Sequence, residues 1–135
     1  MSEIIVLDTH IWFWFVNGDF DQFPAYFRER IEQADMVGVS PVSCFEIALA
    51  RQKGRLSLPC ETRLWLKEAL EPAGIDLFPL TPDISSCAVD LAQIHKDPFD
   101  RIIIATALEN RATLASMDGM FFKYPELHDC LMKKG

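Results

Sequence analysis

The sequence has no apolar stretch long enough to cross a membrane, and its first residues lack the basic character of a signal peptide. A transmembrane helix needs roughly 18–20 consecutive apolar residues, and every apolar run in this chain is interrupted well before that length. Residues 1–3 contain an acid and no Lys or Arg, and they lead directly into the apolar run 4–7. We therefore expect a cytoplasmic protein that has no membrane partner.

Cysteine is scarce and unclustered. The four cysteines are Cys44, Cys60, Cys87 and Cys130, and none of them forms a CxxC pair. Disulfide frameworks and structural zinc sites use cysteines at close, regular spacings. The sequence therefore predicts reduced thiols and neither a disulfide framework nor a zinc site.

Positive charge is also in short supply. The chain has 13 Lys and Arg against 20 Asp and Glu, which gives a formal net charge of −7. Nucleic-acid-binding proteins usually present a basic face, so the overall charge favours a basic protein partner over a nucleic acid. This objection weakens if several acids bind divalent cations, because two such ions would cancel about four negative charges where the substrate meets the protein.

What the sequence does contain is an alternation of short apolar strands with helices. Its 135 residues are 50% hydrophobic, which fits one globular domain over 1–135 with one good core. The expected strands are 4–7, 36–39, 75–78 and 113–115. The expected helices are 11–17, 21–34, 40–53, 61–71, 82–95 and a further helix from Pro98 onward. This alternation predicts an α/β fold, a three-layer α/β/α sandwich with a mostly parallel central sheet.

Four acidic residues lie where the expected strands end or where the helices after them begin. They are Asp8, Glu46, Asp100 and Asp118. Right-handed crossovers place the carboxyl ends of parallel strands on one edge of a sheet, which is where open α/β folds bind their ligands. We therefore expect the four side chains to converge at that edge.

Each of these acids, taken alone, also has an explanation without function. Asp8 can cap the helix that follows it as readily as it can serve a site, and the two interpretations carry equal weight. Asp97 is accounted for as the N-cap of a helix with Pro98 in its first turn. Asp100 is not needed for that cap, although an acid in the first turn gains a little from the helix dipole.

Glu46 has the plainest alternative, because most lone glutamates on helices are simply exposed. Val42, Phe45 and Leu49 form the expected apolar stripe of its helix, and Glu46 lies at the margin of that stripe. The case for function is its placement, since the early turns of this helix rise from the edge that presents Asp8.

Four carboxylates on one edge, without an accompanying set of His and Cys, point to a hard divalent cation. Oxygen ligands suit Mg²⁺ or Mn²⁺ rather than zinc. A carboxylate-bound cation with an open face suits phosphoryl chemistry, because it neutralises charge on phosphate oxygens and makes water more reactive.

The segments that carry these acids resemble the PIN-domain ribonucleases, and among them the VapC-like toxins of type II toxin–antitoxin systems. The matching segments are LDTH at 7–10, SPVSCFEI at 40–47, DPFDRIIIA at 97–105 and LASMD at 114–118. The resemblance implies an endoribonuclease dependent on Mg²⁺ or Mn²⁺, in which the four acids hold metal and activate water for attack on an RNA phosphodiester. It also implies a homodimer and a cognate antitoxin, a segment of which inserts near the active site.

The same resemblance extends to residues around the acids. Ser116 matches a position where the family often has Thr or Ser, and it is a candidate for orienting water. The supporting candidates are Thr9 and Ser43, with Asp97 as an extra outer acid. Few basic residues lie near the acids in sequence, and the candidates for RNA contact are Lys96, Arg101, Arg51 and Lys53. Arg51 and Lys53 have an alternative explanation, because cations at the end of a helix suit its dipole.

Other functions fit less well. A haloacid-dehalogenase-like phosphatase would need a second Asp two residues after Asp8, where the chain has His10. A receiver-type signalling domain would need adjacent acids after the first strand, and they are absent. The remaining alternative is a catalytically silent PIN fold used for protein interaction or assembly. Four intact carboxylates speak against it, because without metal their repulsion serves no purpose.

Overall fold

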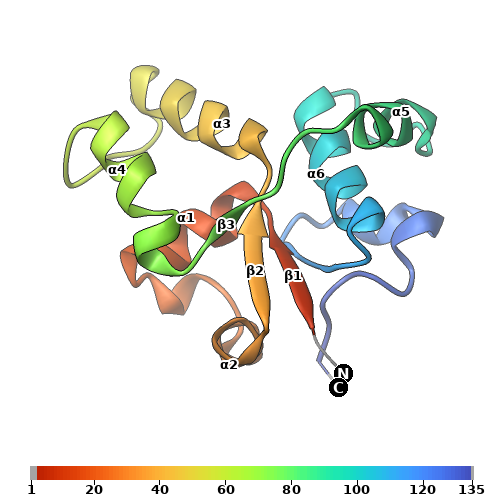
Figure 1. Ribbon diagram of the computed structural model, residues 1–135, viewed down its shortest axis with the longest axis horizontal. Helices are drawn as coiled ribbons and strands as arrows, with labels where there is room; N and C mark the ends of the chain where they lie inside the picture. Colours follow the sequence, from red (N-terminus) through yellow and green to blue (C-terminus); the bar gives the residue numbers. More distant parts are fainter. Residues whose placement is uncertain (1–2, 135) are drawn as a thin grey trace.

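The computed structural model describes residues 3–134, and at its centre is a sheet whose strands are parallel (Figure 1). The strands are β1 (Ile4–Leu7), β2 (Met36–Val39), β3 (Asp76–Leu77) and β4 (Thr113–Ala115), in the spatial order β3-β2-β1-β4. Val6 of β1 pairs with Gly38 on one side and with Leu114 on the other. The carboxyl ends of β1, β2 and β4 therefore lie together on one edge.

Helices cover both faces of this sheet, which confirms the expected three-layer α/β/α sandwich. The α-helices are α1 (Thr9–Asn17), α2 (Ala25–Gln33), α3 (Pro41–Gln52), α4 (Thr62–Glu68), α5 (Pro82–Asp90) and α6 (Pro98–Glu109). In Figure 1, α1 to α4 lie on one side of the strands, and α5 and α6 lie on the other. Short 3₁₀ segments occur at Phe20–Gln22, Glu71–Ala73, Phe121–Lys123 and Pro125–Leu127.

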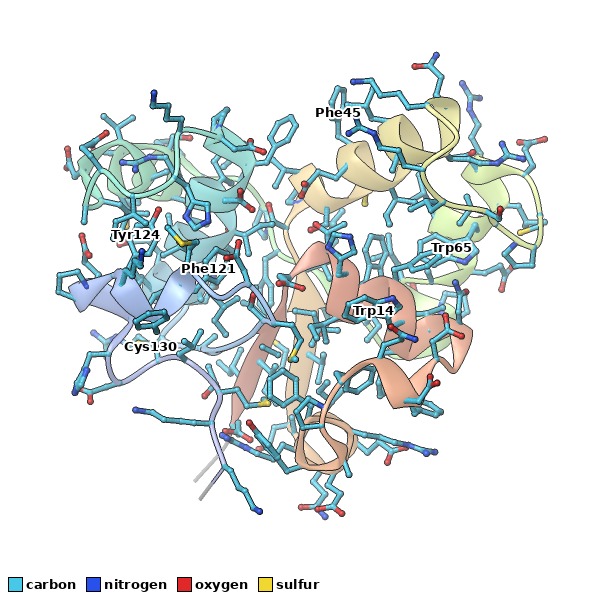
Figure 2. The ribbon with its side chains drawn as sticks, turned by 180° about the vertical axis from the view of Figure 1, so that it is seen from behind. Trp14, Phe45, Trp65, Phe121, Tyr124 and Cys130 are labelled. Atoms are coloured by element: carbon cyan, nitrogen blue, oxygen red, sulfur yellow. The ribbon has the colours of Figure 1, made fainter. Side chains whose placement is uncertain are left out.

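Each face of the sheet has its own apolar core because successive strand residues point to opposite faces. Ile5 and Leu7 face α1 to α4, where Trp12 and Trp65 are buried in the same cluster. Val6 faces the other way, into a cluster built from α6 and the C-terminal segment. Figure 2 shows the two sides, with Trp14 and Trp65 apart from Phe121 and Tyr124.

Three of the expected helices are shorter in the structure. Pro24 interrupts the helix expected over 21–34, because proline lacks an N–H and fits only at the start of α2. The helix expected over 61–71 ends at Glu68. The helix expected over 82–95 ends at Asp90, and the chain from Leu91 onward is irregular. The expected strand 75–78 is likewise reduced to the exposed residues of β3.

Gly38 allows β2 and β3 to pack closely. A Cβ atom at this position would lie 2.6 Å from the carbonyl oxygen of Asp76 and 2.6 Å from the ring of Phe78. Because the first of these contacts is with backbone, a side chain here would push the edge strand away.

Two further expectations concern absences. Within residues 3–134, no helix combines the length and the apolar character needed to span a membrane. All four cysteines are free, as expected.

Candidate metal centre and active site

Asp8 both caps a helix and faces the candidate site, so its two interpretations from sequence are compatible. Its Oδ1 accepts a hydrogen bond from the backbone N–H of Ile11 (3.0 Å), which caps α1. Its Oδ2 accepts a hydrogen bond from the hydroxyl of Ser116, which follows β4. The backbone N–H of Asp8 donates to the carbonyl of Ala115 (3.0 Å), so the ends of β1 and β4 are joined at this point.

The four predicted acids line one cavity of about 470 Å³, which we call the carboxylate cavity. Its lining residues are Asp8, Thr9, His10, Trp14, Glu46, Asp97, Asp100, Ile103, Met117 and Asp118. The acids lie just after β1, in α3, in α6 and in the loop after β4, and the structure thus brings together groups up to 110 positions apart in the chain (Asp8 and Asp118). Their convergence at the strand ends is as the sequence predicted.

Glu46 is half-buried and is held by a threonine from another helix. The hydroxyl of Thr9 donates to Glu46 Oε1 (2.7 Å) and is also hydrogen-bonded to the hydroxyl of Ser43 (2.8 Å). Ser43 is fully buried, and it takes the inward position on α3 that the sequence pattern assigned to Phe45. Phe45 is instead 55% exposed and packs against the ring of Phe99, with ring centroids 5.3 Å apart. The expected apolar stripe was therefore wrong at this residue.

Asp118 is fixed from three sides by groups that include a histidine the sequence analysis missed. His95 Nε2 lies 3.1 Å from Asp118 Oδ2, and the N–H of Met120 donates to Asp118 Oδ1 (2.8 Å). The backbone N–H of Asp118 donates to Ser116 Oγ (3.0 Å), which connects it to Asp8.

Tyr124 orients this histidine. Its hydroxyl accepts from the backbone N–H of His95 (2.9 Å) and lies 2.8 Å from His95 Nδ1. The two rings are stacked, with centroids 5.6 Å apart and an interplanar angle of 8°. His95, Asp100 and Asp118 each offer one ligand atom within 4.8 Å of the others. The only sequence signal for His95 was its place at the start of the segment HKDPFD, and that signal is weak.

Burial and mutual repulsion raise the pKa values of three of the acids. The pKa of Asp8 is raised because its carboxyl is buried, despite the hydrogen bond from Ser116. Burial, together with repulsion from Asp100 and Asp97, raises the pKa of Glu46 to about 6. Burial and repulsion from Asp97 raise the pKa of Asp100 to about 6. Carboxylates in this condition fit a divalent cation, which would favour their ionised forms.

Asp97 keeps the capping role that its sequence position indicated. Its Oδ1 accepts from the N–H of Phe99 (2.9 Å) at the start of α6. Asp97 also lines the carboxylate cavity. It is exposed, whereas Asp8 is buried, and it adds negative charge to the cavity.

Arg101 was expected to contact RNA, and the structure contradicts this. Its side chain is buried (8% exposed), and its guanidinium donates four hydrogen bonds of 2.9–3.3 Å to backbone carbonyls. The acceptors are Val89, Leu91, Ala92 and His95. Arg101 therefore holds the segment after α5 in place, which explains both the early end of that helix and the position of His95.

The other three basic candidates are exposed. Lys53 lines a second cavity beside the carboxylate cavity. Arg51 donates to the hydroxyl of Thr62 (3.3 Å). Lys96 lies just before α6, the helix that carries Asp100. Of these three residues, Lys53 is the one that lines a cavity next to the carboxylates.

A parallel α/β/α sandwich with these four carboxylates at the strand ends is the arrangement expected of the PIN domain class. The sequence matches the PIN domain family over residues 5–127, and the chain belongs to that family. It is 30% identical to Ribonuclease VapC22 of Mycobacterium tuberculosis over 115 residues, which cover 84% of this chain and 86% of the relative.

Solved structures share the fold at lower sequence identity. VapBC2 from Rickettsia felis, bound to a DNA fragment from its promoter, aligns with a TM-score of 0.68 at 16% identity over 98% of this chain and 99% of that one. A toxin–antitoxin complex from Klebsiella pneumoniae aligns with a TM-score of 0.59 at 19% identity, covering 96% of both chains. These likenesses confirm the expected PIN fold.

Proposed function

We propose that the chain is an endoribonuclease, the toxin of a toxin–antitoxin pair, which hydrolyses RNA phosphodiester bonds at the carboxylate cavity. The observation that carries the proposal is the convergence of Asp8, Glu46, Asp100 and Asp118 in one cavity, where burial and repulsion raise the pKa values of three of them. Membership of the PIN family and the 30% identity to a ribonuclease support the reaction class.

Asp8 and Asp100, with Asp118 and Glu46, would hold Mg²⁺ or Mn²⁺. The cation, when bound, supplies charge neutralisation at the phosphate and makes water a better nucleophile at neutral pH. Ser116 fixes the position of Asp8 Oδ2, because its hydroxyl donates to that atom. His95 fixes the other end of the cluster, with its Nε2 lying 3.1 Å from Asp118 Oδ2.

Glu46 is placed to accept the proton that the attacking water loses. Thr9 donates to Oε1, and Oε2 has no hydrogen-bond partner among residues 3–134, so it is free to accept a proton. In the metal-free protein, burial and repulsion raise the pKa of Glu46 to about 6. A bound cation would lower this pKa, because it favours the ionised carboxylate, which is the form that accepts a proton.

The partners follow from the same proposal. The substrate is RNA, and the cognate antitoxin is a protein, as in the toxin–antitoxin complexes of similar fold. A homodimer remains a prediction from the family resemblance, to be measured by analytical ultracentrifugation of the purified chain.

Cleavage of labelled RNA by the purified protein tests the proposal. We expect activity in Mg²⁺ or Mn²⁺, loss of activity in EDTA, and loss in Asp8→Asn and Asp100→Asn. The matched control is Asp83→Asn, which removes one exposed acid in the first turn of α5 and should remain active. A folded wild-type protein that cleaves no RNA, yet binds a partner protein, would favour the silent assembly module instead.

A further inference from the structure

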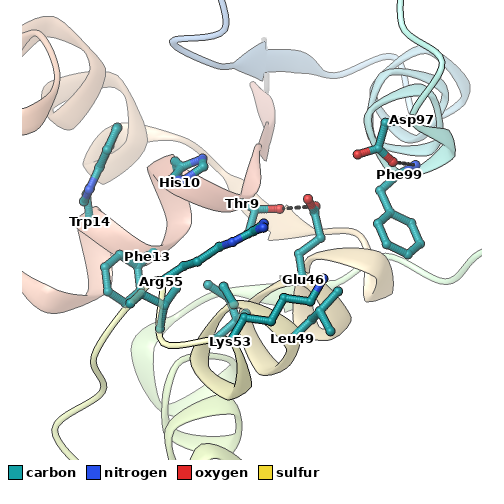
Figure 3. Close-up of a pocket in the computed structure, with 13 residues that line it drawn as sticks. Thr9, His10, Phe13, Trp14, Glu46, Leu49, Lys53, Arg55, Asp97 and Phe99 are labelled. Carbon is teal, nitrogen blue, oxygen red and sulfur yellow. Dashed lines mark hydrogen bonds between the residues drawn. The ribbon is translucent and has the colours of Figure 1, made fainter.

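A second cavity, of about 440 Å³, adjoins the carboxylate cavity (Figure 3). The two cavities share the lining residues Thr9, His10, Trp14, Glu46 and Asp97. A molecule at the carboxylates can therefore continue past Glu46 into the second cavity without leaving the protein surface. Its volume is within the range of about 300–1,000 Å³ that is usual for ligand pockets.

Aromatic rings form one part of the lining of this cavity. Phe13, Trp14 and Phe99 contribute their rings, and the ring of His10 lies 5.4 Å from that of Trp14. Trp14 and His10 belong to both cavities, so their rings stand where one continues into the other.

Two cations form another part of the lining. Lys53 and Arg55, at the end of α3 and just beyond it, both line the cavity, and Figure 3 shows their side chains extending along it toward Glu46 and Thr9. Among residues 3–134, neither side chain forms a salt bridge. Both residues are exposed. They also suit the dipole at the C-terminal end of α3, but the dipole does not require their side chains to extend along a cavity that continues to the carboxylates.

We propose that this second cavity binds the nucleotides next to the scissile phosphate, with Lys53 and Arg55 contacting backbone phosphate and the rings of Trp14 and its neighbours stacking on a base. The inference rests on the proposed ribonuclease function and names the residues that hold its substrate. Other proteins bind single-stranded nucleic acid with the same combination of aromatic rings and positive charge. An acidic peptide would satisfy the cations, but only a peptide with an aromatic side chain at the right position would stack on the rings, whereas every nucleotide carries a flat base.

The positions of the charges also favour one side of the protein for the approach of the substrate. Negative charge is concentrated at the carboxylates, and the cations lie on the α3 side of Glu46. RNA entering from that side would meet attraction before it meets the acids. This arrangement resolves the conflict between an acidic chain and an anionic substrate, because the favourable contacts are local.

The test measures binding of fluorescein-labelled single-stranded RNA of random sequence, about 12 nucleotides long, to full-length protein. The Asp8→Asn background with Mg²⁺ prevents turnover. Lys53→Gln with Arg55→Gln is compared with Arg63→Gln plus Lys67→Gln, which removes two exposed cations from α4. Trp14→Leu is compared with Phe122→Leu, whose ring is 72% exposed on the C-terminal side.

We expect the Lys53 and Arg55 variant to weaken binding about tenfold or more, and to reduce the slope of log K against log salt by about 0.7 for each phosphate that the variant no longer binds. Trp14→Leu should weaken binding by between about 5- and 150-fold, as for removal of one base stack. The control variants should bind as the parent does.

Two outcomes would overturn the inference while leaving the proposed function standing. In the first, the wild type cleaves RNA, but the Lys53 and Arg55 variant and the Trp14 variant bind RNA with the same affinity and salt slope as the control variants. The other is unchanged RNA affinity with weakened binding of a hexaglutamate peptide, which would assign the cavity to a protein segment. If wild-type protein neither binds nor cleaves RNA, the proposed function itself fails.

Discussion

Ser116 and Asp8 lie 108 positions apart in the chain, and the hydroxyl of the first donates a hydrogen bond to Oδ2 of the second. The other oxygen of the same carboxylate caps α1 through Ile11. Asp8 is therefore fixed by local and distant contacts at once, and its charge stays buried at the edge of the sheet. A buried carboxylate with this support is suited to hold a cation rather than to stabilise the fold.

Asp8→Asn separates these two roles. The amide can still accept from the N–H of Ile11, because Asn caps helices about as well as Asp, and it removes a buried charge. We expect a melting temperature in EDTA equal to or above that of wild type, with RNA cleavage reduced by about 100-fold or more. Asp8→Ala should lose the cap as well, at a cost of about 1 kcal/mol. Full cleavage by the Asn variant would contradict the assignment.

The raised pKa values predict how the stability of the metal-free protein varies with pH. Glu46 and Asp100 bind protons more tightly when folded, so their stabilising contribution is present at low pH. It is lost as pH rises from their ordinary pKa values, 4.5 and 3.8, to about 6. In EDTA, Glu46→Gln with Asp100→Asn should therefore gain in melting temperature over wild type across this window.

The control for this prediction is Glu61→Gln with Asp83→Asn, which removes two exposed acids and should show no such gain. Saturating Mn²⁺ should raise the melting temperature of wild type above that of the Glu46 and Asp100 variant at neutral pH. A difference between variant and wild type that is constant from about pH 4 to pH 7 would argue against the pKa assignment.

Arg101 is expected to be a determinant of stability. Arg101→Met leaves four backbone carbonyls without their donor, and we expect the free energy of unfolding to fall by about 3 kcal/mol or more. Arg63→Met, at an exposed position of α4, should change it by less than about 0.5 kcal/mol. Urea denaturation followed by circular dichroism measures both, and equal midpoints would show that the hydrogen bonds to these carbonyls contribute little.

Tyr124→Phe keeps the ring that stacks on His95. It removes the hydroxyl that contacts both the backbone N–H and the ring Nδ1 of His95. His95 would then be less firmly directed at Asp118. Groups that orient the surroundings of a metal typically change its affinity 10- to 100-fold, and we expect Mn²⁺ affinity by calorimetry to fall by about tenfold. Tyr26→Phe, the same change on α2, should leave it unchanged. Identical affinities in the two variants would show that Tyr124 does not support the site.

The parts of the fold that follow local patterns could be predicted from the sequence. Strands 4–7, 36–39 and 113–115 occur at the expected residues, because each is a short, mainly apolar run that is too short for a helix. The convergence of the four acids followed from parallel topology alone, without knowledge of any side-chain contact.

The parts that depend on distant contacts could not be predicted. α5 ends at Asp90, where Arg101 donates to the carbonyl of Val89 in its last turn and to that of Leu91 just after it, and a helix-forming pattern does not reveal such a partner. His95 was missed because its partners Asp118 and Tyr124 are 23 and 29 positions away. The sequence analysis wrongly predicted that Phe45 is buried. Ser43 lies on the inward face of α3 instead, where it is hydrogen-bonded to Thr9, and hydrophobic spacing cannot reveal such a polar contact.

The most direct test is a crystal soaked with Mn²⁺, with the metal located by its anomalous scattering. The account predicts a peak in the carboxylate cavity, with oxygens of Asp8 and Asp100 at a coordination distance of about 2 Å, and no such peak in Asp8→Asn crystals soaked in the same way. Wild-type crystals with Mn²⁺ only elsewhere, or with an empty carboxylate cavity at millimolar metal, would contradict the claim that these acids form one cation site.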